Sequence, residues 1–361
     1  HLLFPTLTSA FDQAEYPDNI FFGVIVQNCF GLEYGVQCRT GMEVIGKNKQ
    51  GRDMTKISDA PADKNGIEEF CHSPNYSKYC ETGQIRVVYM NETDALGPAV
   101  ARYYASKLWG GENYFMQMDS HLEFAEHWDT QYIEEVKLTK NYPKSVLSAY
   151  PPGFQNFDGK YKGGTPGARL CSCVFSDSQV EQHIIRINTN GRSDPNAPRP
   201  TQIAYIAAGF FFAHAQFLVD VPFDPYLAWC FMGEEIALSM RAWTNGWNIY
   251  APRLNLIAHQ YRPGRLGLPK FWESVGRDSG RPNLNTRLQS HIIRRVKHMV
   301  GYPEDTLEKL QEDNDEHVLT DMEYYSLGTT RTREEYLQLA QIDVEEKKCH
   351  NLVWCNKGEL E

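Results

Sequence analysis

The segment that most constrains the fold is a strand, helix, strand pattern that ends at an acid and an imidazole. Residues 84–89 and 114–118 are short apolar runs typical of strands, and residues 95–108 between them have an apolar side chain every four positions. Strand, helix and strand at this spacing predict a βαβ unit with a right-handed crossover. The chain is therefore expected to be an α/β protein.

The second of these strands stops abruptly at Asp119-Ser120-His121. Side chains alternate along extended backbone, so Asp119 and His121 project to the same side. Ligands of open α/β sheets gather at the carboxyl ends of strands. The triplet therefore predicts half of a divalent-metal site, although so short a pattern also arises by chance.

Further elements follow from periodicity and turn residues. We predict helices over 2–14, 127–139 and 233–244, and strands over 20–27, 168–175, 184–188, 203–212, 247–250 and 254–258. Residues 31–83 are interpreted as long loops with little regular structure. The tail after Gly301 has a helical pattern, and Thr332 to Glu335 has the form of a capping box.

The net charge of −10, from 36 Lys and Arg against 46 Asp and Glu, argues against nucleic acid or an anionic membrane as the main partner, while a local basic pocket for a phosphate stays open. The longest apolar run, near residues 203–213, is too short to span a bilayer, so no membrane span is expected.

The nine cysteines include no CxxC pair, which argues against a structural zinc site. Three pairs in loop-like stretches are candidate disulfides: Cys29 with Cys38, Cys71 with Cys80, and Cys349 with Cys355. Asn75-Tyr76-Ser77 and Asn91-Glu92-Thr93 match the N-glycosylation triplet, which is common by chance. We expect a cytoplasmic protein, with the Golgi or secretory lumen as the alternative.

Three other pieces carry chemistry next to predicted strand or helix ends. Ala208 and Gly209 allow backbone to approach a ligand closely. Gly233-Glu234-Glu235 places two acids at a helix start, where acids are also favourable for the helix dipole alone. His259 follows a short strand and precedes Arg262; a lone histidine of this kind is more often a satisfied core residue.

Longer motifs surround these pieces: Gly111-Glu112-Asn113-Tyr114 leading to His121, Val221-Pro222-Phe223-Asp224-Pro225-Tyr226, Arg241-Ala242-Trp243-Thr244-Asn245-Gly246 with His259-Gln260-Tyr261, and Ser326-Leu327-Gly328-Thr329-Thr330-Arg331-Thr332. Over residues 2–348, nearly the whole chain, they resemble the protein (hydroxyproline) N-acetylglucosaminyltransferases, which are retaining GT-A glycosyltransferases. The polypeptide N-acetylgalactosaminyltransferases are more distantly similar.

The resemblance implies a GT-A fold, a Rossmann-like mixed sheet flanked by helices that binds a nucleotide sugar. It divides the chain into a catalytic domain, 1–300, and an acidic helical extension, 301–361, packed on it. Within the catalytic domain, 1–125 would bind UDP and 126–300 the donor sugar and acceptor. Relatives begin with a further strand that helps to hold the uridine, and this sequence starts just after the place of that strand.

The resemblance also implies the reaction: transfer of N-acetylglucosamine from UDP-N-acetylglucosamine to a hydroxyl of an acceptor protein or peptide, with retention. Mn²⁺, or Mg²⁺, would bridge the diphosphate, held by Asp119, His121 and His259. The acceptor is expected to be hydroxyproline, or alternatively Thr or Ser. A UDP-sugar-binding homologue with impaired catalysis, or a transferase of UDP-GalNAc or another UDP-hexose, is the alternative.

Substrate contacts are expected from several side chains and backbone groups. The substrate-binding candidates are Asp94, Arg102, Asp119, Ala208, Gly209, Gly233, Glu234, Arg262 and Arg331. Arg102 is expected either to bind a phosphate or to be a solvated charge on its helix. Arg262 and Arg331 are weaker candidates for phosphate binding. Asp94 is expected to contact uridine or ribose, or to cap the following helix. The catalytic candidates are Glu234, Glu235 and Asp224, of which Asp224 also suits a turn. In the front-face route of the family, the leaving phosphate accepts the proton, so no general base is assigned.

Overall fold

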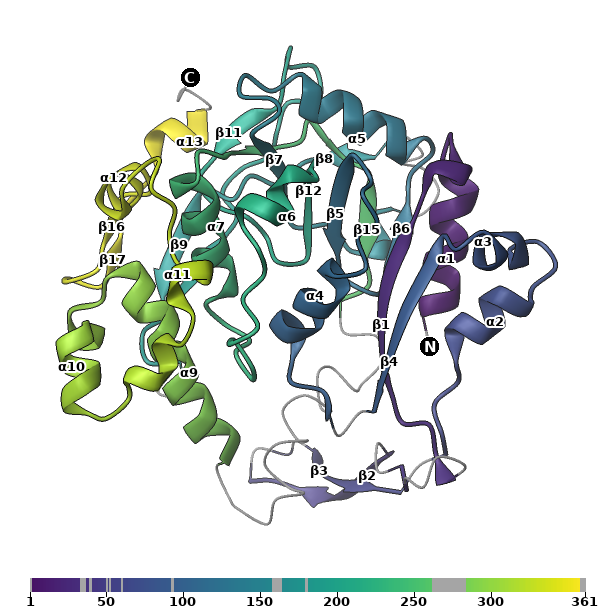
Figure 1. Ribbon diagram of the computed structural model, residues 1–361, viewed down its shortest axis with the longest axis horizontal. Helices are drawn as coiled ribbons and strands as arrows, with labels where there is room; N and C mark the ends of the chain where they lie inside the picture. Colours follow the sequence, from purple (N-terminus) through teal and green to yellow (C-terminus); the bar gives the residue numbers. More distant parts are fainter. Residues whose placement is uncertain are drawn as a thin grey trace.

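A computed structural model describes residues 2–32, 37–38, 41–49, 51, 53–59, 61–91, 94–157, 164–178, 181–261 and 284–357 (Figure 1). The strands are β1 (Phe22–Asn28), β2 (Gly41–Lys47), β3 (Asp53–Ser58), β4 (Ile85–Asn91), β5 (Tyr114–Met118), β6 (Leu122–Phe124), β7 (Ser145–Ser148), β8 (Thr165–Pro166), β9 (Ser172–Phe175), β10 (Ile185–Asn188), β11 (Thr201–Ile203), β12 (Phe210–His214), β13 (Asn248–Ala251), β14 (Leu254–Asn255), β15 (Ile257–His259), β16 (Ile342–Asp343) and β17 (Lys348–Cys349). The helices are α1 (Leu3–Gln13), α2 (Gly66–His72), α3 (Ser77–Glu81), α4 (Pro98–Ser106), α5 (Trp128–Lys137), α6 (Gln216–Asp220), α7 (Glu234–Thr244), α9 (Leu284–Val300), α10 (Leu307–Glu312), α11 (Met322–Tyr325), α12 (Arg333–Leu339) and α13 (Val353–Lys357).

The largest sheet of the described residues has five strands in the order β11-β13-β7-β12-β5. β7 and β13 pair in parallel, whereas β12 runs antiparallel to both β7 and β5. All residues of β7 and β13 are buried, as expected for strands covered on both faces. The predicted α/β class, a mixed sheet flanked by helices with a helical C-terminal region, is confirmed.

The predicted βαβ unit is wrong in one respect. Its helix and two strands form, as α4, β4 and β5, but the strands enter different sheets. β4 pairs in parallel with β1, from Phe22 opposite Ile85 to Asn28 opposite Asn91, and β5 pairs with β12. The end of α4 packs closely on β1, where a Cβ at Gly23 would lie 3.0 Å from Leu108 Cβ. Local periodicity predicts that a segment forms a strand, but it does not predict which other strand that segment pairs with.

A cavity of about 1990 Å³ separates β1 from β5, and residues of both strands line it. Within the described part of the chain, β1 pairs only with β4 and β5 only with β12, so each has an edge towards this space.

Two hydrophobic clusters fill the molecule. One joins α1, α2 and α5 to β6 and β15, with the Phe11 ring stacked on Tyr79 at 4.0 Å between centroids. The other surrounds α7 and includes Val296 of α9 and Tyr336 of α12. Figure 1 shows the N-terminal elements on one side of the large sheet and the C-terminal elements on the other. The predicted domain boundary at residue 300 stays a prediction. Residues after 300, such as Tyr336, belong to the same hydrophobic cluster as the residues of α7.

The extension is held by charges as well as by apolar contacts. Arg294 of α9 binds Asp305, Asp313 and Asp315, and the neighbouring Lys297 lies 2.9 Å from Asp305. Basic side chains of α9 therefore offset part of the acidic tail. The capping box at Thr332 is confirmed, with the Thr332 hydroxyl and the Glu335 carboxylate each bonded to the other's backbone N–H.

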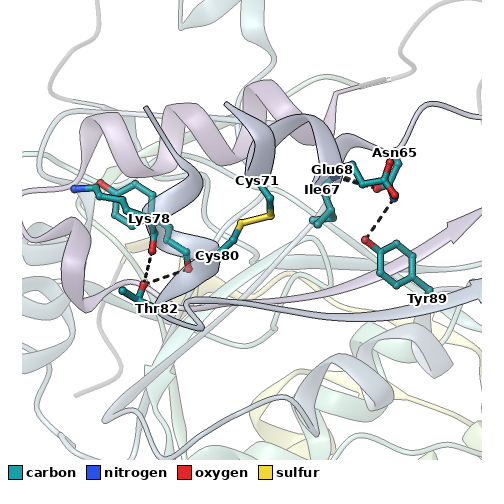
Figure 2. Close-up of a disulfide and its surroundings, with 9 residues drawn as sticks. Asn65, Ile67, Glu68, Cys71, Lys78, Cys80, Thr82 and Tyr89 are labelled. Atoms are coloured by element: carbon teal, nitrogen blue, oxygen red, sulfur yellow. Dashed lines mark hydrogen bonds between the residues drawn. A yellow bond between two sulfur atoms is a disulfide. The ribbon is translucent and has the colours of Figure 1, made fainter. Parts of the chain in front are cut away.

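Residues 31–83 contain more regular structure than predicted. β2, β3, α2 and α3 all lie within this segment. They are short: α2 begins at an Asn65 cap whose side chain accepts hydrogen bonds from the backbone of Ile67 and Glu68. Elements this short contain too few residues for a hydrophobic period to be recognised in the sequence. A disulfide joins α2 to α3 (Figure 2).

The predicted strand over 203–212 is wrong in its middle. β11 ends at Ile203 and β12 begins at Phe210. Between these strands, side chains accept the hydrogen bonds of the backbone N–H groups. Ser239 Oγ accepts from the N–H of Ile206, and Ser148 Oγ accepts from the N–H of Ala207. The Glu235 carboxylate accepts from the N–H of Ala208. Buried backbone must be paired, and here side chains replace the strand ladder.

The disulfides agree with two of three predicted pairs. Cys29–Cys38 and Cys71–Cys80 form, but Cys349 pairs with Cys173 and Cys355 with Cys171. The predicted Cys349–Cys355 bridge is wrong because β17 lies beside β9, which brings Cys349 to Cys173. No described helix has the length and apolar character to cross a membrane.

Candidate active site

Asp119 lies directly after β5, at the mouth of the cavity. Its backbone N–H donates to Gly209 O at 3.1 Å, which continues the β5–β12 pairing by one residue. A Cβ at position 209 would stand 2.9 Å from Asp119 Oδ2. Gly209 therefore gives the Asp119 carboxylate its space, in agreement with the predicted close approach of backbone at this point.

His121 and His259 come together through a second strand pair. β6 begins just after His121 and pairs antiparallel with β15, whose last residue, His259, lies opposite Leu122. The ring centroids of His121 and His259 are 5.9 Å apart, and His259 Nε2 is 3.6 Å from Asp119 Oδ2. The structure thus brings together the three side chains predicted as metal ligands.

The donor set suits a divalent ion, but its arrangement is not a formed metal centre. In the described residues, no group of three or more His, Cys, Asp or Glu side chains is arranged to hold one. Burial lowers the pKa of His121, and His259 lowers it further. Burial also lowers the pKa of His259, against the opposing effect of Asp119. Both imidazoles are therefore neutral at neutral pH, the form that binds metal.

Arg102 ties two carboxylates together instead of standing as a solvated helix charge, and its role as a phosphate ligand stays a prediction. One guanidinium nitrogen donates to Glu234 and another to Asp119 Oδ1, the latter at 3.1 Å. The side chain is only 12% exposed. Burial lowers the pKa of Arg102, but the two carboxylates outweigh it and raise the pKa above its ordinary value. Arg102 is a permanent cation that holds Asp119 and Glu234 in place.

Glu234 is the first residue of α7 and lines the cavity. Its Oε2 accepts from Arg102, whereas its Oε1 is buried without a hydrogen-bond partner in the described part of the chain. Burial raises the pKa of Glu234, against the effect of Arg102. A buried acceptor without a partner is costly, so Oε1 is suited to receive a ligand hydroxyl.

Glu235 has both oxygens engaged. Tyr150 Oη donates to Oε2 at 2.7 Å, and the Ala208 N–H donates to Oε1 at 3.0 Å. Burial raises the pKa of Glu235 to about 7, although these two hydrogen bonds oppose the rise. Ala208 is thereby fixed beside Gly209 at the cavity wall.

Two tyrosines at this site were not predicted as site residues, although Tyr261 belongs to the His259-Gln260-Tyr261 motif. Tyr150 holds Glu235, and Tyr261 donates to Pro151 O at 2.8 Å while its ring contacts the His259 ring at 4.3 Å between centroids. Tyr150 lies two residues beyond β7, and Tyr261 two beyond β15. Their positions just after strands, where ligands of α/β sheets bind, could have identified them as candidate site residues.

Several predicted residues do not contact the cavity. Asp224 forms a buried ion pair with Arg295 at 2.7 Å, and its other oxygen accepts from Tyr226 N, as in the turn considered as the alternative. Arg331 donates to Asn248 Oδ1 at 2.8 Å and lies over the Trp243 ring. Both are structural in this arrangement.

The remaining predicted residues divide between the cavity and its surroundings. Gly233 caps α7 with φ +100°, lines the cavity and packs between Ile184 and Val296. Asp94 is exposed, and it does not cap α4, whose N-cap residue is Gly97. Arg262 lies outside the described residues.

The chain belongs to the family described as glycosyltransferase (GlcNAc), whose family model matches residues 1–346. No curated protein matches the chain significantly. A solved structure of GalNAc-T7 with UDP, GalNAc and Mn²⁺ resembles it with a TM-score of 0.42 and 12% sequence identity, over 77% of this chain and 48% of that one. The chain spans about half the length of that protein.

Proposed function

We propose that this glycosyltransferase moves N-acetylglucosamine from UDP-N-acetylglucosamine to a hydroxyl group of an acceptor protein, with retention and with help from a divalent cation. The observation that carries the proposal is the group around Arg102. The end of β5 and the start of α7 bring Asp119, Glu234 and Glu235 to one wall of the cavity. The family membership supplies the sugar-transfer chemistry, and this group supplies a place for the donor.

The charges at this wall favour a cation. Asp119 and Glu234 share one guanidinium, and both histidines are neutral, so the surroundings of Asp119 carry more negative than positive charge. A diphosphate would add further negative charge at the same place. Bound Mn²⁺ or Mg²⁺, held by Asp119, His121 and His259, would offset that charge and stabilise the UDP leaving group. Imidazole ligands favour Mn²⁺ over Mg²⁺.

The donor sugar is assigned to the wall formed by Glu234, Ala208 and Gly209. Glu234 Oε1 is a buried acceptor without a partner, and a sugar hydroxyl would satisfy it. Arg102 holds the other oxygen of Glu234, so the carboxylate is oriented before the sugar arrives. A site built to accept from a hydroxyl discriminates strongly against a sugar that lacks it.

Retention is supported by the family resemblance rather than by a particular base. Glu234 and Glu235 are each bound by neighbouring groups, which suits positioning better than proton transfer. The acceptor hydroxyl proton then passes to the departing phosphate. We assign hydroxyproline as the acceptor residue, with Thr or Ser as the alternative.

A donor screen tests the proposal. The purified protein is given UDP-GlcNAc, UDP-GalNAc or UDP-glucose with a hydroxyproline peptide or a matched proline peptide, with Mn²⁺ or with a chelator, and products are read by mass spectrometry. Transfer of N-acetylhexosamine from UDP-GlcNAc alone, dependent on Mn²⁺ and hydroxyproline, is expected. Tight UDP-GlcNAc binding without transfer or hydrolysis would instead indicate a binding homologue with impaired catalysis.

Variants locate the cation. Asp119→Asn and His259→Ala should each lower transfer at least a hundredfold while the fold, read by circular dichroism, is kept. Asp224→Asn is the control, because it removes a buried carboxylate that does not line the cavity. It should lower the free energy of unfolding more than it lowers the turnover of the folded protein. Full transfer by both Asp119→Asn and His259→Ala would contradict the metal assignment.

A further inference from the structure

The turn between α2 and α3 presents a side chain that the glycosyltransferase chemistry does not use. Asn75-Tyr76-Ser77 matches the N-glycosylation triplet, and Asn75 is exposed in this turn. Ser77 is the first residue of α3. An N-glycan requires an asparagine that is accessible on a surface loop. The placement of Asn75 therefore meets the requirement that the bare triplet does not guarantee.

The turn that carries Asn75 is tied to the protein through Tyr76 and a nearby disulfide. The Tyr76 ring stacks on Phe70 at 5.0 Å between centroids, and its hydroxyl donates to Asp12 at 2.8 Å. The disulfide Cys71–Cys80 closes the segment that contains the turn (Figure 2). Because Tyr76 is packed inward and the ends are joined, the backbone of the turn holds Asn75 outward.

The disulfides supply the second, independent observation. Eight of the nine cysteines are paired in four bridges, and Cys230 is buried. Bridges of this number persist in the oxidising secretory compartments and are rare in the cytosol. N-glycosylation takes place on chains that enter the same compartments. The exposed triplet and the cysteine pairing therefore indicate one location.

We propose that Asn75 is an N-glycosylation site and that this protein folds and acts in the secretory lumen, in place of the cytoplasm expected from the sequence. The modification joins the Asn75 amide nitrogen to the anomeric carbon of a lipid-diphosphate-linked oligosaccharide. The bond between that carbon and the diphosphate oxygen breaks, the lipid diphosphate leaves with the bonding electrons, and the amide nitrogen loses one proton.

A glycan at Asn75 is compatible with sugar transfer in the cavity. The described lining of the cavity contains no residue between 65 and 83. α2 and α3 lie at the outer edge of the molecule, beyond α1 (Figure 1). The glycan would cover this edge and leave the region of Asp119 open.

The second triplet has a different setting. Asn91 is the last residue of β4, lies in register with Asn28 of β1 and is only partly exposed. Its two following residues lie outside the described part of the chain. The proposal is therefore made for Asn75 alone.

The test uses the natural full-length protein isolated without reduction from the cells that make it. Peptide mass spectrometry before and after peptide-N-glycosidase treatment should find a glycan on Asn75 in most copies, and Asp at this position after treatment. The same peptide should retain the Cys71–Cys80 bridge. Unmodified Asn75 in most copies would overturn the proposal.

Matched variants expressed in the same cells separate modification from folding. Ser77→Ala removes the triplet and should abolish the glycan, whereas Ser77→Thr keeps the triplet and should preserve it. Both leave Asn75 in place, so any glycan remaining on Asn75 in the Ser77→Ala protein contradicts the assignment. Transfer activity of both variants should stay within twofold of the unmodified sequence, which separates failure of this proposal from failure of the proposed function.

Discussion

Arg102 is the side chain on which the candidate site depends most. It is nearly buried, and it donates to Asp119 and to Glu234, two residues separated by more than a hundred positions in the chain. Its fork reaches both carboxylates at once, which a lysine ammonium cannot do in the same geometry. One cation thereby positions a candidate metal ligand and a candidate sugar acceptor together.

Replacement of this guanidinium tests the positioning role. Arg102→Lys should keep the charge but lose one of the two carboxylates, and we expect kcat/KM for donor transfer to fall about 10- to 100-fold, about 1.4 to 2.8 kcal/mol of transition-state stabilisation. Initial rates at varied UDP-GlcNAc and Mn²⁺ measure the fall. An unchanged kcat/KM would contradict the role.

Arg86→Lys is the matched control. Arg86 also lines the cavity, and its guanidinium pairs with one carboxylate, Glu112, at 2.6 Å. Its side chain is more exposed than that of Arg102, so the lysine variant should change kcat/KM less than threefold. A similar loss in both variants would indicate a general effect of cavity charge rather than the double contact of Arg102.

Glu235 predicts a pH dependence of stability. Burial raises its pKa from 4.5 to about 7. The folded state therefore binds more protons than the unfolded state, and the stabilising contribution of the protonated form, complete below 4.5, is lost as pH rises to 7. Glu235→Gln removes the titrating carboxyl group. As the pH rises from 4.5 to 7, the free energy of unfolding of the variant should therefore increase relative to that of the parent by up to about 3 kcal/mol.

Denaturant unfolding of the parent and of Glu235→Gln at several pH values checks this prediction. The difference between the two free energies of unfolding is the informative quantity, since the other titrating groups are common to both proteins. A difference that stays constant between pH 4.5 and 7 would exclude the raised pKa.

Among the elements, the short strand pair β6–β15 has the largest effect on the site. Each strand has three residues, yet their pairing places His259 beside His121. The segment between β11 and β12 has a comparable role, since side-chain acceptors hold its backbone and leave Ala208 and Gly209 at the cavity wall. These are tertiary hydrogen bonds, and local sequence patterns do not report them.

The two bridges between β9 and the C-terminal segment predict a non-additive loss of stability. Cys171–Cys355 spans 184 residues and Cys173–Cys349 spans 176. While the first bridge is intact, the second closes only the short path between them, so its removal by Cys173→Ser with Cys349→Ser should cost about 2 to 3 kcal/mol.

Removal of both bridges frees the long loop as well, and the cost should rise to about 7 kcal/mol or more. Thermal and denaturant unfolding of the double and quadruple Ser variants measures the two losses. Equal losses would mean that Cys171–Cys355 contributes nothing once Cys173–Cys349 is broken, contrary to the loop-entropy argument. Removal of Cys71–Cys80, which spans 9 residues, is the short-loop comparison.

For the whole molecule, the cavity between β1 and β5 is the principal feature. It separates the β1–β4 pair from the large sheet, and the candidate donor site lies along it. A donor bound there, as proposed, would add interactions that the protein alone lacks. Binding should therefore raise the stability of the entire chain.

UDP with Mn²⁺ at a hundred times its dissociation constant should stabilise the folded state by about 2.7 kcal/mol, a rise of several degrees in Tm. Differential scanning fluorimetry of the parent and of Asp119→Asn, with UDP, Mn²⁺ or both, measures it. The rise should need both ligands and should be absent in Asp119→Asn. A full rise with UDP and a chelator would show that the nucleotide binds without the cation.

The sequence by itself determined the residue types and the local elements of this protein. The apolar run before Asp119, the acids after Gly233 and the capping box at Thr332 all have local causes, because alternation, helix starts and caps are encoded within a few residues. Only the tertiary structure decided which of these pieces meet. It paired β4 with β1 instead of β5, joined Cys349 to Cys173, turned Arg102 onto two carboxylates and placed Asp224 against Arg295. These outcomes depend on contacts between distant segments, whose free energy comes from burial and charge pairing that no local pattern contains.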